Sequence, residues 1–520
     1  MRKTGHPKKT AKTKKDLFIL EEKQPFSTSR IWELQRQYFD SVGIEAWRQG
    51  EVPHYITSNP VMGKTYAEIA LAFLRDLARQ NKSDDTVYLL ELGAGHGRLC
   101  YHFLKHFTSC YEQIPESLPP FCYILSDFTG KNLEFWQKHP RLQPFLEQGI
   151  LDLALFDAET SGELQLRHSG TPIQPGSLAQ PLLVIGNYFF DTISQELFFI
   201  QDRELSQCLL SLGVETDPAS LSPAELLKQL ILKYDYQKLE QNLYPEPYLD
   251  SLMESYRAEV SGAHLLFPHT GIRCLERLRK LSTGGLALLT ADKGQHRIED
   301  LGRENAPGLV THGSFSLSVN YHALKLYCEN SGGLALFPRQ IHGSLDLGCL
   351  LMVPETESYR ETRLAFERFV NQFGPDDFYN ILKIVEERIP SFDVQNILSV
   401  LRFSGYDART FSYIVPRLHE VLDEVSEDER FSIFQTVHQI WDMYYPLGEK
   451  KDLAFELGTI LLRLEFYREA AVYYELSVKI YGYSKETLQL LLICYDRLGE
   501  DEKARNIIAE MKAGQADRLV

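Results

Sequence analysis

As far as about residue 354, two patterns of apolar positions alternate along the chain. Short apolar runs of strand length occur first at residues 87–92. Between such runs, apolar residues recur at helical spacing, as at Ile69, Phe73 and Leu77. This alternation predicts a Rossmann-like α/β fold with a mainly parallel sheet. The predicted strands cover residues 87–92, 121–126, 151–156, 182–185 and 285–290, with a final antiparallel pair at 314–320 and 345–353, which makes a seven-stranded sheet.

Residues 202–265 interrupt this rhythm with segments of helical character at 223–236 and 247–260. They predict a helical insertion that covers the active-site face as a substrate lid. Ahead of the first strand of the sheet, helices are predicted at 29–42 and 61–80.

From residue 355 the apolar runs of strand length stop and the pattern becomes helical to the end. The clearest feature there is an internal repeat of 34 residues, which is the period of the tetratricopeptide (TPR) repeat. Generic helical packing is the alternative. The prediction is an all-α, TPR-like domain over 355–520, preceded by a basic disordered tail over 1–25 and the α/β domain over 26–354. The repeated positions are Leu457, Leu461, Ala470 and Tyr474, which recur as Leu491, Tyr495, Ala504 and Ile508.

Composition narrows the classes of function. The formal net charge of the 520 residues is −16, and residues 1–15 carry seven Lys and Arg without an acid, so the remainder is strongly acidic. The acidic charge of residues 16–520 argues against nucleic-acid binding. No apolar run is long enough to cross a bilayer, and the eight cysteines form no C-x-x-C pair. We therefore expect a cytoplasmic protein without a membrane segment, a disulfide scaffold or a metal site.

The candidate binding site follows the first strand of the sheet, where Glu91 is followed by Gly93, Gly95 and Gly97. A strand, a glycine-rich turn and a helix form the ligand-binding corner of a doubly wound sheet. A dinucleotide fingerprint would need G-x-G-x-x-G, but Arg98 stands at its last position. The acidic E-x-G-x-G-x-G form instead resembles motif I of class I S-adenosylmethionine (SAM)-dependent methyltransferases.

Acidic residues follow the next strands. Asp127 ends the second strand and is a candidate to accept hydrogen bonds from ribose hydroxyls, with capping of the following helix as the alternative. Asp157 ends the third, and the fourth runs into G-N-Y-F-F-D-T-I-S-Q-E at 186–196. Within that motif we assign Asp191 to orienting the substrate; a structural role is the alternative.

Several stretches together resemble the MidA-type methyltransferases, the group that includes mitochondrial complex I assembly methyltransferases. They are H-Y-I-T-S-N-P at 54–60, E-L-G-A-G-H-G at 91–97, D-F-T-G-K-N-L at 127–133, G-N-Y-F-F-D-T-I at 186–193 and G-S-F-S-L-S-V-N-Y-H-A-L at 313–324. The resemblance implies a SAM cofactor and methylation of a protein arginine. One departure is Tyr188, where the family usually has a glutamate.

The resemblance also implies roles for single residues. Glu91 and the glycines would hold the methionine part of SAM, Asp127 the ribose and Asp157 the adenine side. The full set of implied cofactor-binding residues is Thr57, Glu91, Gly93, Ala94, Gly95, Gly97, Asp127, Phe128, Asp157, Ala158 and Asn187, with Asn187 and Asp191 as catalytic residues.

Two other functions compete with an active methyltransferase. The first is a catalytically inactive methyltransferase-like protein that serves as a TPR interaction scaffold, which Tyr188 favours. The second is a nicotinamide oxidoreductase, which the glycine spacing disfavours. Whether the protein is an active methyltransferase or an inactive scaffold, we expect the TPR-like tail to bind a protein substrate or partner, or to form a homodimer.

Overall fold

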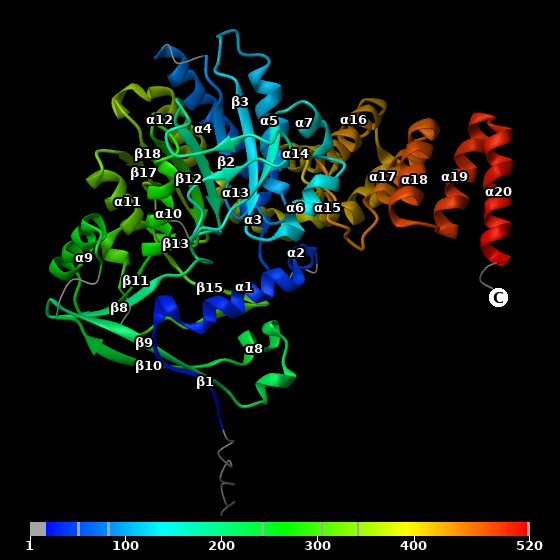
Figure 1. The fold of residues 1–520 in the computed structure, drawn as a ribbon. Coiled ribbons are helices and arrows are strands. Elements are labelled where there is room, and N and C mark those ends of the chain that lie inside the picture. Colours follow the sequence, from blue (N-terminus) through cyan, green and yellow to red (C-terminus); the bar gives the residue numbers. More distant parts are fainter. Residues whose placement is uncertain are drawn as a thin grey trace, which may run out of the picture.

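The computed structural model describes residues 17–48, 52–80, 84–240, 244–302, 305–340 and 343–516. At its centre is a seven-stranded sheet with the order β17-β18-β12-β7-β2-β3-β4 (Figure 1). Strands β4, β3, β2, β7 and β12 run parallel, and β18 is antiparallel to both of its neighbours. The bounds are β2 Val87–Glu91, β3 Phe121–Asp127, β4 Leu151–Leu155, β7 Leu182–Asn187, β12 Leu286–Asp292, β17 Leu334–Leu336 and β18 Asp346–Met352.

Helices cover both faces of this sheet because both sides of its strands are apolar. Leu89 packs in one apolar cluster with helices α4 and α5, whereas Leu90 packs in another with α9, α10 and α11. The predicted helix 61–80 is confirmed as α4. The helix bounds are α4 Pro60–Arg79, α5 Arg98–Tyr111, α6 Gly130–Lys138, α7 Gln143–Glu147, α9 Pro247–Glu259, α10 His269–Arg279 and α11 Tyr321–Asn330.

The prediction of seven strands is confirmed, but one member is wrong. Residues 314–320 do not join the sheet; they form the short strands β15 Ser314–Ser316 and β16 Val319–Asn320. The edge strand is β17 instead, which pairs with β18. The side chain of Phe315 is buried in a separate cluster with helix α1, Arg30–Val42, and the carbonyl of Phe315 accepts a hydrogen bond from Gln35 Nε2 at 2.8 Å.

The prediction of a helical insertion over 202–265 is largely wrong. This part of the chain forms most of a five-stranded antiparallel sheet, β1 Phe18–Pro25, β8 Glu196–Gln201, β9 Glu204–Val214, β10 Ile231–Lys238 and β11 Ala263–Phe267. The predicted helix 223–236 is limited to α8, Pro223–Gln229, because Leu232 and Tyr234 alternate at strand spacing and pack on the cluster beneath β9. The helix predicted at 247–260 is confirmed as α9.

Strand β1 also corrects the predicted tail. Residues 1–16 lie outside the described part, but residues 18–25 pair with β9 as an edge strand rather than forming a disordered end. From β1 the chain enters α1, whose N-cap is Ser29; its oxygen accepts a hydrogen bond from the Ile31 amide.

Residues beyond 355 are helical; the first of these helices pack against the α/β domain, and the later ones, as far as α20, extend away from the central sheet (Figure 1). Six of the eight repeated positions are buried, but Ala504 is half-buried and Ile508 is 39% exposed; both lie on α20, the last helix of the described residues. None of the helices in the described part is both long and apolar enough to cross a membrane. The helix bounds are α12 Arg360–Phe366, α13 Pro375–Arg388, α14 Val394–Phe403, α15 Ala408–Val421, α16 Glu427–Met443, α17 Leu453–Arg463, α18 Tyr467–Tyr481, α19 Lys485–Leu498 and α20 Asp501–Ala516.

The change in secondary structure near residue 355 is not a gap in packing. Tyr359 and Phe366 belong to the same apolar cluster as α4 and α5, and so do Tyr445 and Leu447 from the segment after α16. Asp76 near the end of α4 accepts hydrogen bonds from the backbone amides of Glu361 and Thr362. The first C-terminal helices and residues 445–447 are therefore built into the core of the α/β domain.

Candidate functional site

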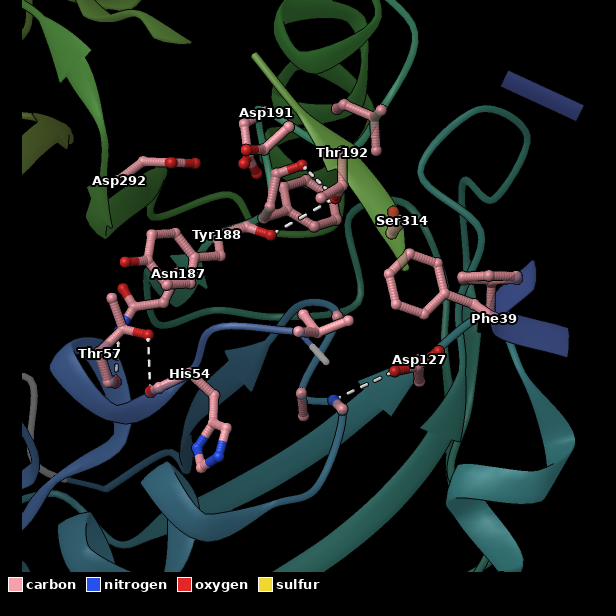
Figure 2. Close-up of a pocket in the computed structure, with 18 of the residues that line it drawn as sticks. Phe39, His54, Thr57, Asp127, Asn187, Tyr188, Asp191, Thr192, Asp292 and Ser314 are labelled. Carbon is pink, nitrogen blue, oxygen red and sulfur yellow. Dashed lines mark hydrogen bonds between the residues drawn. The ribbon is translucent and has the colours of Figure 1, made fainter. Parts of the chain in front are cut away.

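A cavity of about 320 Å³ lies between helix α1 and the carboxyl ends of β2, β3, β7 and β12 (Figure 2). Most of the residues predicted for the site line it, namely Thr57, Glu91, Gly93, Ala94, Gly95, Asp127, Phe128, Ala158, Asn187 and Asp191. Two predicted residues, Gly97 and Asp157, are not part of its lining. The position agrees with the general rule for open α/β sheets, which bind ligands outside the carboxyl ends of the strands.

The glycine loop has positive φ angles at Gly93, Gly95 and Gly97, of 58°, 54° and 76°. A Cβ at Gly95 would lie 2.7 Å from Trp47 Cζ2. At Gly97 it would lie 3.1 Å from the indole of Trp136 and from the Tyr445 hydroxyl. The loop therefore needs glycine for two reasons. Its backbone has positive φ angles, and two tryptophans and a tyrosine pack where a side chain would otherwise lie.

Glu91 is a buried acid at the end of β2. Its Oε2 accepts a hydrogen bond of 2.7 Å from the Tyr123 hydroxyl. Burial is the main cause that raises the pKa of Glu91 to about 8, so this carboxyl is mostly protonated at neutral pH. A ligand that brings a positive charge to Glu91 would stabilise the ionised form.

Asp127 connects the glycine loop to α6. Its Oδ2 accepts hydrogen bonds from the Gly95 amide at 3.1 Å and from Asn132 Nδ2 at 3.0 Å, and its Oδ1 accepts one from the Thr129 amide. The N-cap of α6 is Thr129, so Asp127 does not cap this helix itself. Asp127 thus braces the loop while it still lines the cavity.

The side chain of Asn187 holds two neighbouring segments. Its Oδ1 accepts a hydrogen bond of 2.6 Å from the Tyr66 hydroxyl, and its Nδ2 donates one of 3.1 Å to the Thr57 carbonyl. Thr57 lies in the one-turn helix α3, Tyr55–Ser58, and its hydroxyl donates to the carbonyl of His54. The structure thus brings the predicted residues Thr57 and Asn187 together and fixes them against each other.

A pair of buried carboxyls, Asp191 and Asp292, lies on the side of the cavity away from Asp127 (Figure 2). Burial and the neighbouring acid raise the pKa of Asp292 well above its usual range, and burial raises the pKa of Asp191 to about 7. In the described part of the chain, Asp191 Oδ1 and Asp292 Oδ2 have no hydrogen-bond partner. Two neighbouring acids in one buried site cannot both ionise readily, so the pair retains a proton and would favour a cationic or hydrogen-donating ligand.

Asp157 faces Arg36 of α1 instead of the cavity. Its two carboxylate oxygens pair with Nη1 and Nη2 of Arg36 at 3.3 and 2.6 Å, and the Arg36 guanidinium also lies over the ring of Phe128, 4.7 Å from its centroid. Next along the chain, Ala158 and Glu159 do line the cavity. After strand β4, the acid that lines the cavity is thus Glu159 and not Asp157.

Trp47, His54, His96 and Asp292 also line the cavity and were not predicted. The rings of His54 and His96 lie 4.7 Å apart, and burial lowers the pKa of both imidazoles, that of His54 to about 3, so they are neutral. His54 stands in the H-Y-I-T-S-N-P stretch, and Asp292 comes two residues after the predicted strand 285–290, so both were within reach of the arguments used for their neighbours. Trp47 has no comparable signal.

Among the described residues, one group of side chains that could ligate a metal ion lies outside the cavity. Glu68 of α4 and His106 and Cys110 of α5 come together, with 2.8 Å between His106 Nε2 and Glu68 Oε1.

Residues 68–309 match the model of a family described as "Putative S-adenosyl-L-methionine-dependent methyltransferase". This match supports a SAM-dependent methyltransferase and confirms SAM as the predicted cofactor. No curated protein matches the chain.

Two solved structures from Burkholderia thailandensis are similar at 15% identity. One is an uncharacterized COG1565 superfamily protein, with a TM-score of 0.37 over 61% of this chain and 73% of the other. The second is a COG1565 superfamily member and likely methyl transferase bound to S-adenosyl-homocysteine, with a TM-score of 0.38 over 61% and 74%.

Proposed function

We propose that this protein is an active methyltransferase that transfers the methyl group of SAM to a nitrogen atom of a protein side chain, with arginine as the acceptor that the MidA resemblance implies. The observation that carries the proposal is the pair of buried acids in the same cavity as the glycine loop. The pair of acids also offers a replacement for the carboxylate that is missing at Tyr188. The glutamate that the family usually has is absent here, but Asp292 supplies a second acid beside Asp191.

The residues of the cavity fit SAM, because the acids Glu91, Asp127 and Glu159 all line it. Glu91 would face the ammonium of the methionine part, Asp127 the ribose hydroxyls, and Phe128, Ala158 and Glu159 the adenine side. SAM would supply a methyl group on sulfonium: a bond forms from the acceptor nitrogen to the methyl carbon, and the C–S bond breaks with its electron pair left on sulfur.

The chain itself would orient the acceptor and take up its proton. Asp191 and Asp292 share a proton while the acceptor is absent, and the arrival of a guanidinium would favour loss of this proton. Once its methyl group is added, the nitrogen gives up a proton, which an ionised Asp191 can accept. Asn187 would position the wall of the cavity through Thr57 and Tyr66.

The C-terminal helices would bind the protein substrate or another protein partner as a TPR-like array. Large apolar side chains are exposed on consecutive helices of this array, among them Val472 on α18 and Ile493 on α19. Such positions are suited to contact with another polypeptide.

A direct test is to measure SAM binding by calorimetry and methylation of cell lysate with labelled SAM, for the wild type and for Asp191→Asn. We expect both proteins to bind SAM and only the wild type to label protein. A wild type that binds SAM but labels nothing would favour the inactive scaffold. Failure of the wild type to bind SAM would refute the proposal.

A further inference from the structure

A second cavity, of about 330 Å³, lies between the α/β domain and the C-terminal helices. Its walls come from α5, from the chain around α3, from α15 and from the segment between Met443 and Glu456. Trp47 and His54 line this cavity as well as the first one. The two cavities are therefore neighbours, separated by these two side chains.

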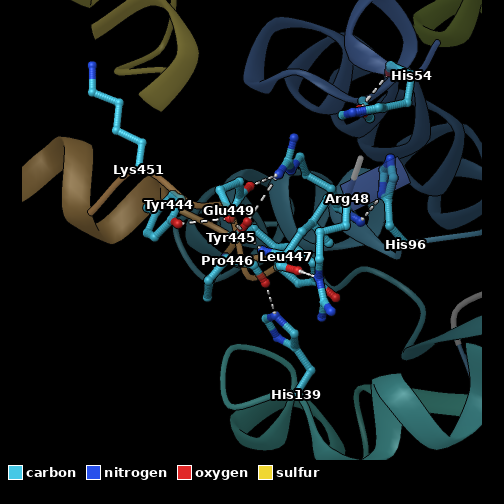
Figure 3. Close-up of polar contacts among 12 residues, drawn as sticks. Arg48, His54, His96, His139, Tyr444, Tyr445, Pro446, Leu447, Glu449 and Lys451 are labelled. Atoms are coloured by element: carbon cyan, nitrogen blue, oxygen red, sulfur yellow. Dashed lines mark hydrogen bonds and ion pairs between the residues drawn. The ribbon is translucent and has the colours of Figure 1, made fainter. Parts of the chain in front are cut away.

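The segment that forms one wall is held firmly to the α/β domain (Figure 3). The carbonyl of Pro446 accepts a hydrogen bond of 2.9 Å from His139 Nε2, and the His139 ring stacks on Tyr445 at a centroid distance of 3.8 Å. Arg98 Nη2 donates to Glu449 Oε1 at 2.8 Å, and Arg48 donates to the carbonyl of Leu447. The cavity is thus bounded by a packed and hydrogen-bonded junction.

The acids of this second cavity already have partners. Glu449 accepts from Arg98 and from the Tyr444 hydroxyl, Asp407 accepts from the Tyr55 hydroxyl at 2.9 Å, and Glu456 lies 3.5 Å from His419.

Two cations that line the cavity, Arg409 and Lys451, differ from these acids because they form no ion pair with another described residue. In the part of the chain that the structure describes, neither Arg409 nor Lys451 has an acid within ion-pair distance, and the Arg409 guanidinium lies over the ring of Tyr55, 4.2 Å from its centroid. Neither cation is thus neutralised by a direct ion pair within the described residues, so both are available to an anionic ligand.

His102 and Tyr445, which also line the second cavity, are 3% and 1% exposed. The remaining surface is mainly aromatic and apolar, from Tyr55, Phe411, Tyr444, Leu447 and Leu453.

We propose that this interdomain cavity binds a small molecule that carries a carboxylate or phosphate on an apolar or aromatic body. The anionic group would lie between Arg409 and Lys451, and the body between the aromatic walls. The proposal goes beyond methyl transfer and does not depend on it. Because the occupant would contact Trp47 and His54, which also line the first cavity, its binding and that of SAM are expected to influence each other.

The test uses the full chain and two anionic probes, phenyl phosphate and phenylacetate, with benzyl alcohol as the uncharged control. Binding is measured by calorimetry and by ligand-observed NMR. We expect at least one anion to bind and the alcohol not to bind; which anion binds more tightly distinguishes phosphate from carboxylate. The double variant Arg409→Gln/Lys451→Gln should bind that anion about tenfold more weakly, since two charge contacts are lost.

A matched double variant, Arg402→Gln/Lys450→Gln, removes two exposed cations that do not line the cavity and should bind as the wild type does. Ser412→Trp, which places an indole in the cavity, should abolish binding of the anion. Circular dichroism of each variant verifies that it is folded. Equal binding of the anion to the wild type and to the Arg409/Lys451 variant, or no binding of either anion to the wild type, would overturn the proposal.

Discussion

The raised pKa of Glu91 makes the affinity for SAM dependent on pH in a defined direction. The unliganded protein holds a proton on this carboxyl up to a pKa of about 8. A ligand ammonium prefers the ionised form, so binding releases this proton below that pKa. Affinity should therefore rise with pH up to about 8 and then level off.

The size of the effect follows from the fraction of Glu91 that is ionised. With a pKa of about 8, this fraction is about one in a hundred at pH 6 and about one in eleven at pH 7. The affinity for SAM should thus increase about tenfold over this one unit of pH, which corresponds to about 1.4 kcal/mol. Between pH 6 and 7 an α-amino group stays mostly protonated, so titration of the ligand interferes little.

The assay is calorimetry of SAM binding at pH 6, 6.5 and 7 in buffers of different ionisation enthalpy, which also counts the released protons. Glu91→Gln is the control, because glutamine has nearly the same shape and does not titrate. The variant should bind SAM with little dependence on pH. A wild type whose affinity changes by less than about twofold across this range, without proton release, would refute the assignment of Glu91.

Three further outcomes are expected. Gly95→Ala should lower the unfolding free energy by about 1–2 kcal/mol and weaken SAM binding, because of the positive φ and the 2.7 Å approach to Trp47; adding Trp47→Ala should restore part of the loss in thermal unfolding. Asp191→Asn should abolish methyl transfer and raise the melting temperature more at pH 8 than at pH 5, since the pKa of about 7 in the folded protein means that stability is lost as pH rises through that value. A chain that ends at residue 355 should fail to fold, because part of the core is missing, whereas deletion of residues 485–516 should leave SAM binding unchanged; soluble yield and calorimetry distinguish these results.

The sequence was sufficient for the parts of the site that follow from local pattern. Glu91, Asp127 and Asn187 stand at the ends of apolar runs, and parallel strands bring such ends to one edge of a sheet. Pairs of side chains from distant segments produce no local pattern in the sequence. Arg36 takes up the carboxylate of Asp157 from 121 residues away, which no periodicity indicates.

Strand pairing failed for the same reason. Residues 18–25 form a strand only because β9 is present as a partner, and Lys23 donates to Ser211 across 188 residues of sequence. The sequence of strand β10 does show the alternation of a strand, at Leu232 and Tyr234. Its polar residues are equally compatible with one face of a helix, which is why a helix was predicted there.

The packing of Tyr445 on the glycine loop has a consequence for synthesis of the protein in the cell. About 350 residues separate Gly97 from Tyr445. At ribosomal rates of about 5–20 residues per second, the loop waits about 20–70 s for this ring to emerge. Until then the N-terminal part of the nascent chain has an exposed apolar surface where Tyr445 and Leu447 later pack. The packing around the glycine loop is therefore completed only after Tyr445 and Leu447 have emerged, and chaperones have a long interval in which to act on the incomplete chain.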